Sequence, residues 1–473
     1  MNWTLALPEI VLSLCGMGIL VVGVLRKAES TQLCTMLTLG AFLIAALLVV
    51  SAATGAAYHG LFVSDPFSGF AQVLILAAAA LVLVMSLDFN AREGLARFEF
   101  PVLVLFSVVG MMIMVSAGNL MTLYLGLELQ SLALYVLTAF ARDNLRSSEA
   151  GLKYFVLGAL AAGLMLYGIS LVYGFSGGTG FVHLTHALAG PHVSPGLIVG
   201  VVFVLAGLVF KVSAVPFHMW TPDVYEGAPT PVTAFLGTAP KVAAMALILR
   251  TMLSPFGHIQ PQWQLLIEIV SIASMILGAL AAIGQTNIKR LMAYSSIGHM
   301  GYALIGLAAG TMSGVRGTLV YLVVYVFMNI GTFAVIIAMR RRGRALDKIS
   351  DLAGLARTDP ALALVMAVFM FSMAGIPPMS GFFGKLYIFL AAVQSGLWAL
   401  AVVGVLTSVV GAFYYIRIIW VMYFTDSVEE AFDTRAPSLS VVAAAAGLFT
   451  TFFFLLPAPI VDAAQIAAKV LLG

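Results

Sequence analysis

Cysteine is almost absent from this sequence. Only two of its 473 residues are cysteines, Cys15 and Cys34, and both lie in apolar segments without a CxxC pair. Iron–sulfur clusters and structural zinc sites are built from sets of cysteine thiolates, so we expect this chain to hold neither a cluster nor a metal. Any redox chemistry linked to this protein must therefore occur in other chains.

Charged residues are also scarce. They make up 9% of the chain, whereas 62% is hydrophobic and the mean hydropathy is +1.07. This composition excludes an ordinary soluble domain and requires repeated membrane spans. The net charge of +3 is too small to indicate nucleic-acid binding. Residues 4–25 lack a preceding basic segment, which indicates a first membrane span and not a cleaved signal peptide.

Apolar runs bounded by charged residues, glycine or proline predict an all-α polytopic membrane protein with about fourteen transmembrane helices. The expected spans are residues 4–25, 32–52, 67–88, 100–117, 119–141, 152–174, 196–221, 230–253, 263–284, 291–309, 317–339, 361–394, 397–424 and 438–457. We expect one membrane domain over residues 1–473, with helices 1–3 (residues 1–99) at its periphery.

The basic residues support this number of spans, because they gather in alternate loops. One set of loops receives most of the 23 lysines and arginines, whereas the other set receives only Arg250, Arg316 and Lys469. Loops rich in lysine and arginine face the cytoplasm. We therefore expect both termini on the periplasmic side.

Two of the predicted spans are broken. As one straight helix, residues 361–394 would be roughly 50 Å long and would overshoot a bilayer core of about 30 Å. Pro377 and Pro378 mark the break in this span, and Pro216 marks another in the seventh span. Irregular backbone at membrane depth is tolerated where it is buried in protein or lines water.

The order of spans predicts an internal repeat. Spans 4–8 (residues 100–253) and 9–13 (residues 263–424) form two five-helix units, and the last helix (residues 438–457) follows them. Because five is odd, the second unit starts on the opposite face of the membrane and is inverted. Broken helices 7 and 12 then occupy equivalent positions, as in many transporters.

Four ionisable residues lie near the middle of predicted spans, namely Glu128, Lys211, Lys241 and Lys385. A charged group at that depth is costly and is by default a functional feature. We expect the three lysines to be protonated in turn, with Glu128 setting the proton affinity of the first, in a relay through water. The alternative is a set of static ion pairs, but one acid cannot neutralise three lysines.

Histidine and hydroxyl groups fit secondary places in this relay. His299 comes between Lys241 and Lys385 in the predicted order, and its ordinary pKa of about 6.5 suits proton transfer, although helix histidines also serve as packing residues. His218 fits either proton uptake at the cytoplasmic end of its span or a helix-end contact. The side chains expected to order water beside His299 include Tyr294, Ser295 and Tyr302.

Two carboxylates follow the seventh span. Asp223 and Glu226 lie in a predicted cytoplasmic loop. They fit attraction of protons to the mouth of the relay, and they also fit ordinary solvated loop carboxylates.

Four stretches together carry a family resemblance, at residues 147–174, 211–241, 285–302 and 374–387. They are similar to the subunit N family of bacterial NADH-quinone oxidoreductase, respiratory complex I. Members of this family are antiporter-like subunits of the membrane arm. The resemblance extends over about residues 120–390 and implies the fourteen-helix inverted-repeat fold.

The resemblance implies a proton-translocating subunit of a translocase, driven by NADH oxidation and quinone reduction in other subunits. At matching positions it assigns the relay to Glu128, Lys211, Lys241 and Lys385. It places the flavin, the iron–sulfur clusters and the quinone headgroup in partner subunits, and no cofactor in this chain. It also implies an obligate assembly with the other membrane-arm subunits, including the other antiporter-like subunits, and contact with lipids in a bacterial inner membrane.

A subunit of a multi-subunit Na⁺/H⁺ antiporter is the alternative function, because chains of that class resemble this fold. Dedicated sodium sites favour several oxygen ligands at depth. The predicted spans contain no aspartate near their middle and only one glutamate, Glu128.

Overall fold

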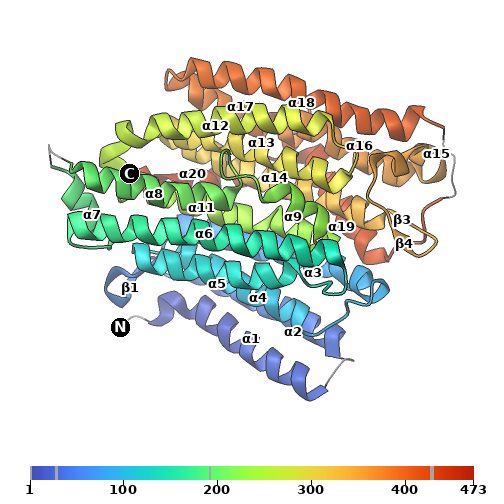
Figure 1. Ribbon diagram of the computed structural model, residues 1–473, viewed down its shortest axis with the longest axis horizontal. Coiled ribbons are helices and arrows are strands. Elements are labelled where there is room, and N and C mark those ends of the chain that lie inside the picture. The colour runs from blue at the N-terminus through green and yellow to red at the C-terminus, as the bar shows by residue number, and fades with distance from the viewer. Residues whose placement is uncertain (1–2, 27–29, 191–192, 427–430, 473) are drawn as a thin grey trace.

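The long helices of this chain lie side by side and run along one common direction (Figure 1). The structure is a computed structural model that describes residues 3–26, 30–190, 193–426 and 431–472. The helices are α1 (Leu7–Arg26), α2 (Thr31–Ser51), α3 (Pro66–Arg92), α4 (Glu99–Val115), α5 (Leu120–Thr138), α6 (Leu145–Ser176), α7 (Phe181–Leu188), α8 (Pro195–Val212), α9 (Thr221–Gly227), α10 (Thr230–Leu236), α11 (Ala239–Leu253), α12 (Gln260–Ile283), α13 (Ile288–Ala309), α14 (Met312–Ala338), α15 (Leu355–Thr358), α16 (Pro360–Ala374), α17 (Ser380–Gln394), α18 (Trp398–Phe424), α19 (Pro437–Phe452) and α20 (Ala458–Leu472).

The predicted membrane architecture is confirmed, because each of the expected spans coincides with one or more of these helices. Among the described residues, 11 helices are long and apolar enough to cross a membrane, and α4, α16 and α17 are shorter apolar helices. The count of fourteen spans stays a prediction.

The breaks in the seventh and twelfth spans are also found. α8 ends at Val212 and α9 begins only at Thr221, with Pro216 between them. α16 ends at Ala374 and α17 begins at Ser380, and this gap contains Pro377 and Pro378.

A third break, between α10 and α11 in the eighth span, was not predicted from the sequence. Gly237 and Thr238 separate the two helices. Pro240 lies in the first turn of α11. Because proline has no backbone N–H, it cannot donate to the carbonyl of Leu236 and continue the earlier helix.

The two five-helix units pair their helices in the same way. α4 packs along α5 as α12 packs along α13, and α6 packs along α8 as α14 packs along α17. Of the N-terminal helices, α1 and α2 lie along one edge of the bundle in Figure 1, whereas α3 packs against helices of both units. The peripheral position of residues 1–99 stays a prediction.

The last helix, α20, follows the final predicted span and was not expected. It packs against α3 and α14, and Arg316 donates a hydrogen bond to Gln465 across a distance of 3.0 Å. The two ends of the chain lie toward the same end of the bundle (Figure 1). The arginine-rich hairpin of β3 (Arg340–Arg341) and β4 (Arg344–Ala345) lies at the opposite end, as the alternation of loop charges predicted.

Arg250 differs from its assignment as a loop charge. It is buried at the end of α11, and its Nη2 lies 2.7 Å and 2.9 Å from the two carboxylate oxygens of Asp65. Asp65 caps α3 by accepting from the backbone N–H of Ser68. The ion pair therefore ties the start of α3 to the end of the eighth span.

Gly110 tests the close packing of α4 on α5. A Cβ atom there would lie 2.4 Å from the backbone N of Gln130 and 2.6 Å from the carbonyl oxygen of Gly126, and neither backbone atom can move aside. Gly110→Leu should destabilise the fold by about 1–3 kcal/mol or more. We expect a marked loss of the chain from purified membranes, measured by quantitative immunoblotting. Gly163→Leu is the matched control, because no atom lies within 4 Å of that position; equal losses in both variants would contradict the packing argument.

Candidate functional site

Lys211 lies in the last turn of α8, immediately before the break. Its Nζ donates a hydrogen bond to the hydroxyl of Ser131 on α5, at 2.7 Å, and lies 3.5 Å from the hydroxyl of Tyr135. Glu128, the partner expected from charge alone, lies one helical turn before Ser131. In the described part of the chain Glu128 forms no ion pair, and its buried Oε1 has no hydrogen-bond partner.

Lys241 lies in the first turns of α11 and reaches the same break from the other side. Its Nζ donates to the backbone carbonyl of Val212 at 2.9 Å and to the hydroxyl of Ser213. Ser213 has a left-handed backbone, with φ of 63°, which ends α8 and exposes the last carbonyls. The indole ring of Trp220 lies 5.4 Å from the same Nζ. The ammonium groups of Lys211 and Lys241 therefore both lie near the end of α8, although each contacts different partners.

Lys385 repeats this arrangement in the second five-helix unit. Its Nζ donates to the carbonyls of Met373 and Ala374, at 2.9 Å and 3.1 Å, and these are the last residues of α16. It also donates to the hydroxyl of Ser408 on α18 at 2.7 Å. Lys241 and Lys385 thus both place an ammonium group at the carboxyl end of an interrupted helix, where unpaired carbonyls carry partial negative charge.

The three ammonium groups are deeply buried and share one kind of neighbour. Lys211, Lys241 and Lys385 are 5%, 1% and 6% exposed. None of them forms an ion pair with an acid in the described ranges. Each donates instead to a serine hydroxyl, and these are Ser131, Ser213 and Ser408 respectively.

His299 lies on α13 at the centre of a hydroxyl cluster. Its Nδ1 is 2.5 Å from the hydroxyl of Tyr321, and its Nε2 is 3.0 Å from that of Tyr415. Tyr415 also contacts Ser295 at 2.5 Å. A cavity of about 10 Å³ is lined by His299, Ser295 and Lys385, so the histidine cluster and the last lysine share one polar space.

Tyr302 and Tyr294, both predicted beside His299, have different surroundings. The ring of Tyr302 lies 5.1 Å from Lys385 Nζ, and its hydroxyl is 3.2 Å from that of Thr407. Tyr294 is half-buried, and its hydroxyl has no hydrogen-bond partner among the residues that the structure describes. Tyr302 thus joins the predicted group, whereas Tyr294 does not.

Hydroxyl groups also occupy the space between Lys241 and His299. Tyr325 donates to Ser296 at 2.8 Å, and the Tyr325 ring lies 5.4 Å from His299. On the lysine side, the hydroxyls of Tyr225 and Thr221 are buried without a protein partner in the described residues. Buried hydroxyls of this kind are normally satisfied by ordered water.

At the end of the bundle opposite the termini, Asp223 and Glu226 belong to one ion-pair network. Arg290 Nη1 lies 2.6 Å from Asp223 and 3.0 Å from Glu226, and Lys153 Nζ lies 3.0 Å from Asp223. A cavity of about 200 Å³ opens beside these carboxylates. Burial raises the pKa of Asp223, but hydrogen bonds from Arg290 and Lys153 outweigh burial, so the pKa lies below its ordinary value.

His218 lies apart from this network, in the break between α8 and α9. It is half-buried, and its Nδ1 has no hydrogen-bond partner among the described residues. The described chain also contains no group of three or more His, Cys, Asp or Glu side chains that could hold a metal ion.

Several residues of the site were missed by the sequence analysis. They are Ser131, Tyr135, Ser213, Tyr225, Lys289, Tyr321, Tyr325, Ser408 and Tyr415. Lys289 was assigned to a loop, but it is buried and its Nζ donates to the carbonyl of Ala228 at 2.8 Å. Only Ser131 carried a signal, because it lies one helical turn from Glu128.

Known proteins resemble this chain over most of its length. Residues 117–411 match the family described as NADH:quinone oxidoreductase/Mrp antiporter, TM. The chain is 68% identical to NADH-quinone oxidoreductase subunit N of Granulibacter bethesdensis and 58% identical to that of Gluconacetobacter diazotrophicus, with 100% of each chain covered.

Solved structures show the same fold. A chain of respiratory complex I from Thermus thermophilus with bound aureothin superposes with a TM-score of 0.83 at 32% identity, covering 97% of this chain and 99% of that chain. A chain of the Mrp complex from Dietzia sp. superposes with a TM-score of 0.86 at 22% identity, covering 100% of this chain and 98% of that one. The second likeness concerns the fold alone.

Tyr415→Phe tests the histidine cluster. The substitution leaves the hydroxyl of Ser295 and Nε2 of His299 without their shared partner, which should cost about 1–3 kcal/mol of stability. We expect a lower midpoint for heat-induced loss of this chain from the purified assembly, measured by native gel electrophoresis. Tyr294→Phe is the control, because that hydroxyl has no partner among the described residues, and its midpoint should stay at the wild-type value. A Tyr415→Phe midpoint equal to that of Tyr294→Phe would contradict the assigned contacts.

Proposed function

The chain belongs to the NADH-quinone oxidoreductase subunit N family, and we propose that its buried lysines form the path by which it moves protons across the membrane. Chains of this family are subunits of an enzyme complex and assemble with its other membrane-arm subunits. In our proposal this chain carries out no redox step and holds no cofactor. NADH oxidation and quinone reduction in partner subunits would drive the movement of protons through this chain.

One observation carries the proposal: each of three buried ammonium groups donates to a serine hydroxyl, and none is neutralised by an acid in the described chain. An ion pair holds its proton, because both partners stabilise the charged state. A hydroxyl both donates and accepts hydrogen bonds, so it can connect an ammonium group to the next water or hydroxyl. Contacts between lysine and serine hydroxyl groups therefore support proton transfer, whereas static ion pairs between lysine and an acid would not.

The proposed path begins at the carboxylates that line the 200 Å³ cavity. From there, the proton would pass to Lys211 and then to Lys241 at the first break. It would continue by way of the Tyr225 hydroxyl to His299 and finally to Lys385. Water would bridge the stretch between Lys241 and His299, where buried hydroxyls have no protein partner among the described residues. Glu128 would tune the first lysine through its charge, without direct contact.

We also propose the membrane orientation and compartment. Basic loops at one end of the bundle and the chain ends at the other support a cytoplasmic end at β3 and β4, with both termini periplasmic. The bacterial relatives support an inner-membrane location. Nothing specific favours the cation antiporter, since the Mrp likeness extends to the fold alone. Co-purification of this chain with flavin and iron–sulfur subunits would separate the two functions.

Lys241→Ala and Lys211→Ala test the path. Proton transfer by a positioned side chain contributes about 10²–10⁴-fold to a rate, so proton flux through this chain should fall by about 10-fold or more in each variant. The ratio of protons pumped to electrons transferred, measured in sealed vesicles, should fall while the complex remains assembled. Lys469→Ala, an exposed lysine of α20, should leave the ratio unchanged. An unchanged ratio in the Lys211 and Lys241 variants would rule out the relay.

Asp223→Asn tests the uptake end. Because its pKa is depressed, the carboxylate stays charged from pH 5 to 8 and is neutralised only as the pH falls through its lowered pKa. Removing the charge should slow proton uptake by up to about 10-fold at low salt, because local charge raises the local proton concentration. The difference from wild type should be constant from pH 5 to 8, as measured by vesicle acidification. Asp143→Asn, whose side chain is 92% exposed, is the control and should have little effect. Equal effects of both substitutions would contradict the role of Asp223.

A further inference from the structure

A second cavity lies away from the lysine path, between α2, α3, α14 and α20. Its volume is about 790 Å³, which is within the range of about 300–1,000 Å³ of pockets that enclose small molecules. Most of its wall is apolar. One end of its wall includes Thr54 and Ser64, which adjoin the strand β1 (Gly55–Ala57), and β1 lies at the end of the bundle that carries the chain termini (Figure 1).

The polar side chains of this cavity gather at one end. Ser64 ends the strand β2 (Phe62–Ser64), and Asp65 caps α3. Ser116 follows the end of α4, and Gln72 lies in the second turn of α3. The apolar wall continues inward to Phe327, about 22 Å along α14 from its start. Since the hydrocarbon core is about 30 Å thick, the cavity runs from the headgroup level toward the middle of the membrane.

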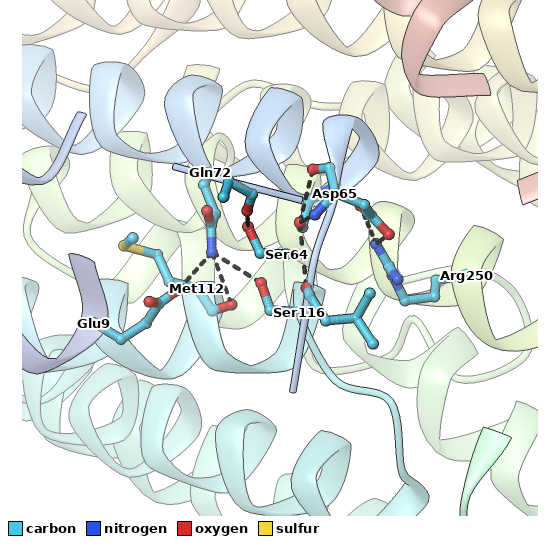
Figure 2. Close-up of polar contacts among 10 residues, drawn as sticks. Glu9, Ser64, Asp65, Gln72, Met112, Ser116 and Arg250 are labelled. Carbon is cyan, nitrogen blue, oxygen red and sulfur yellow. Dashed lines mark hydrogen bonds and ion pairs between the residues drawn. The ribbon is translucent and has the colours of Figure 1, made fainter. Parts of the chain in front are cut away.

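Gln72, which lines this cavity, has a hydrogen-bond acceptor that is not used within the described chain. Its Nε2, which carries two hydrogens, lies 2.6 Å from Glu9 Oε1, 3.0 Å from Ser116 Oγ and 3.4 Å from the carbonyl oxygen of Met112 (Figure 2). These contacts fix the amide, and its side-chain carbonyl oxygen has no partner among the described residues. Gln72 is 5% exposed and lines the cavity, so the oxygen is available to a ligand there.

The charges around the polar end favour a ligand that donates hydrogen bonds. Arg250, which lies beside Asp65 in Figure 2, is already bonded to both carboxylate oxygens of Asp65. Glu9 is buried, and its Oε2 has no partner in the described chain. Among the described residues, Asp65 is the carboxylate that lines the cavity, and Arg250 already pairs with it. A headgroup with net negative charge would therefore meet no unpaired cation in this wall, whereas the ammonium group of a zwitterionic headgroup meets acceptors.

We propose that this cavity binds one phospholipid of the ethanolamine class from the surrounding leaflet. Its ammonium headgroup donates to the side-chain carbonyl of Gln72, and one acyl chain lies along Phe327. The amphipathic wall matches a lipid, with polar groups at one end and apolar groups from there to mid-membrane. The backbone N–H groups of a partner-subunit helix are used within that helix, so only one of its side chains could donate to the Gln72 oxygen, whereas the ammonium headgroup brings three donors.

Photo-crosslinking in the purified complex tests the proposal. A benzophenone amino acid replaces Phe327 in the cavity, or Leu47 on the outward face of α2, which is 63% exposed and serves as the control. The complex is placed in vesicles of phosphatidylethanolamine and phosphatidylglycerol, or of phosphatidylcholine and phosphatidylglycerol, and adducts are identified by mass spectrometry. One hydrogen bond predicts about 2- to 10-fold enrichment of phosphatidylethanolamine at position 327 over position 47.

Two further variants separate the headgroup contact from the cavity. Gln72→Leu should abolish the enrichment while lipid adducts remain, and Ala77→Phe should reduce all lipid adducts at position 327 by filling the cavity. The amount of chain in the purified complex shows that each variant assembles. A peptide adduct from another subunit, no adduct, or lipid adducts with the same composition at both positions would overturn the proposal.

Discussion

The buried charges in the interior of this chain depend on one kind of contact, in which a lysine ammonium group donates to the carbonyls at the carboxyl end of a broken helix. Lys241 donates to Val212, the last residue of α8, and Lys385 donates to Met373 and Ala374, the last residues of α16. The final carbonyls of a helix lack intrahelical donors and carry partial negative charge. Each break therefore supplies a counter-charge that no acidic side chain provides. Without the breaks, the lysines would be isolated charges in a low-dielectric interior, which proteins rarely tolerate.

This arrangement also brings the first two lysines of the proposed path to the end of the same helix. Lys211 lies within the last turn of α8, and Lys241 binds the carbonyl that ends it. A change in the charge of Lys241 alters the field at the end of α8, and Lys211 is one residue away from that end. The two residues are thus coupled through a short piece of backbone. A change in the charge of one lysine could therefore alter the proton affinity of the other without direct contact between their side chains.

The sequence allowed the lysines, the breaks and the order of spans to be predicted, because a charge or a proline inside an apolar run is visible without a structure. The identity of the partners could not be predicted. Charge alone favoured Glu128 as the neighbour of Lys211, yet Ser131 occupies that place, because the rotation of α5 about its axis decides which side chain faces α8. Lys289 follows polar residues in the sequence, which predicts a position in a solvated loop. In the structure, its ammonium group instead donates to the carbonyl of Ala228, just after α9.

Tyrosines illustrate the same limit in the second half of the site. Tyr321 and Tyr415 lie 94 positions apart on α14 and α18 and contact the two nitrogens of one histidine. Nothing in either span distinguishes them from the tyrosines that face lipid. Their position follows from the packing of α14 and α18 around α13, which brings hydroxyls to both edges of the ring. A neutral imidazole with hydroxyls on both edges can accept at one nitrogen and donate at the other. In the proposed path, this geometry would let His299 transfer a proton without a buried counter-charge, whereas Lys241 and Lys385 would depend on the carbonyl groups at the ends of broken helices.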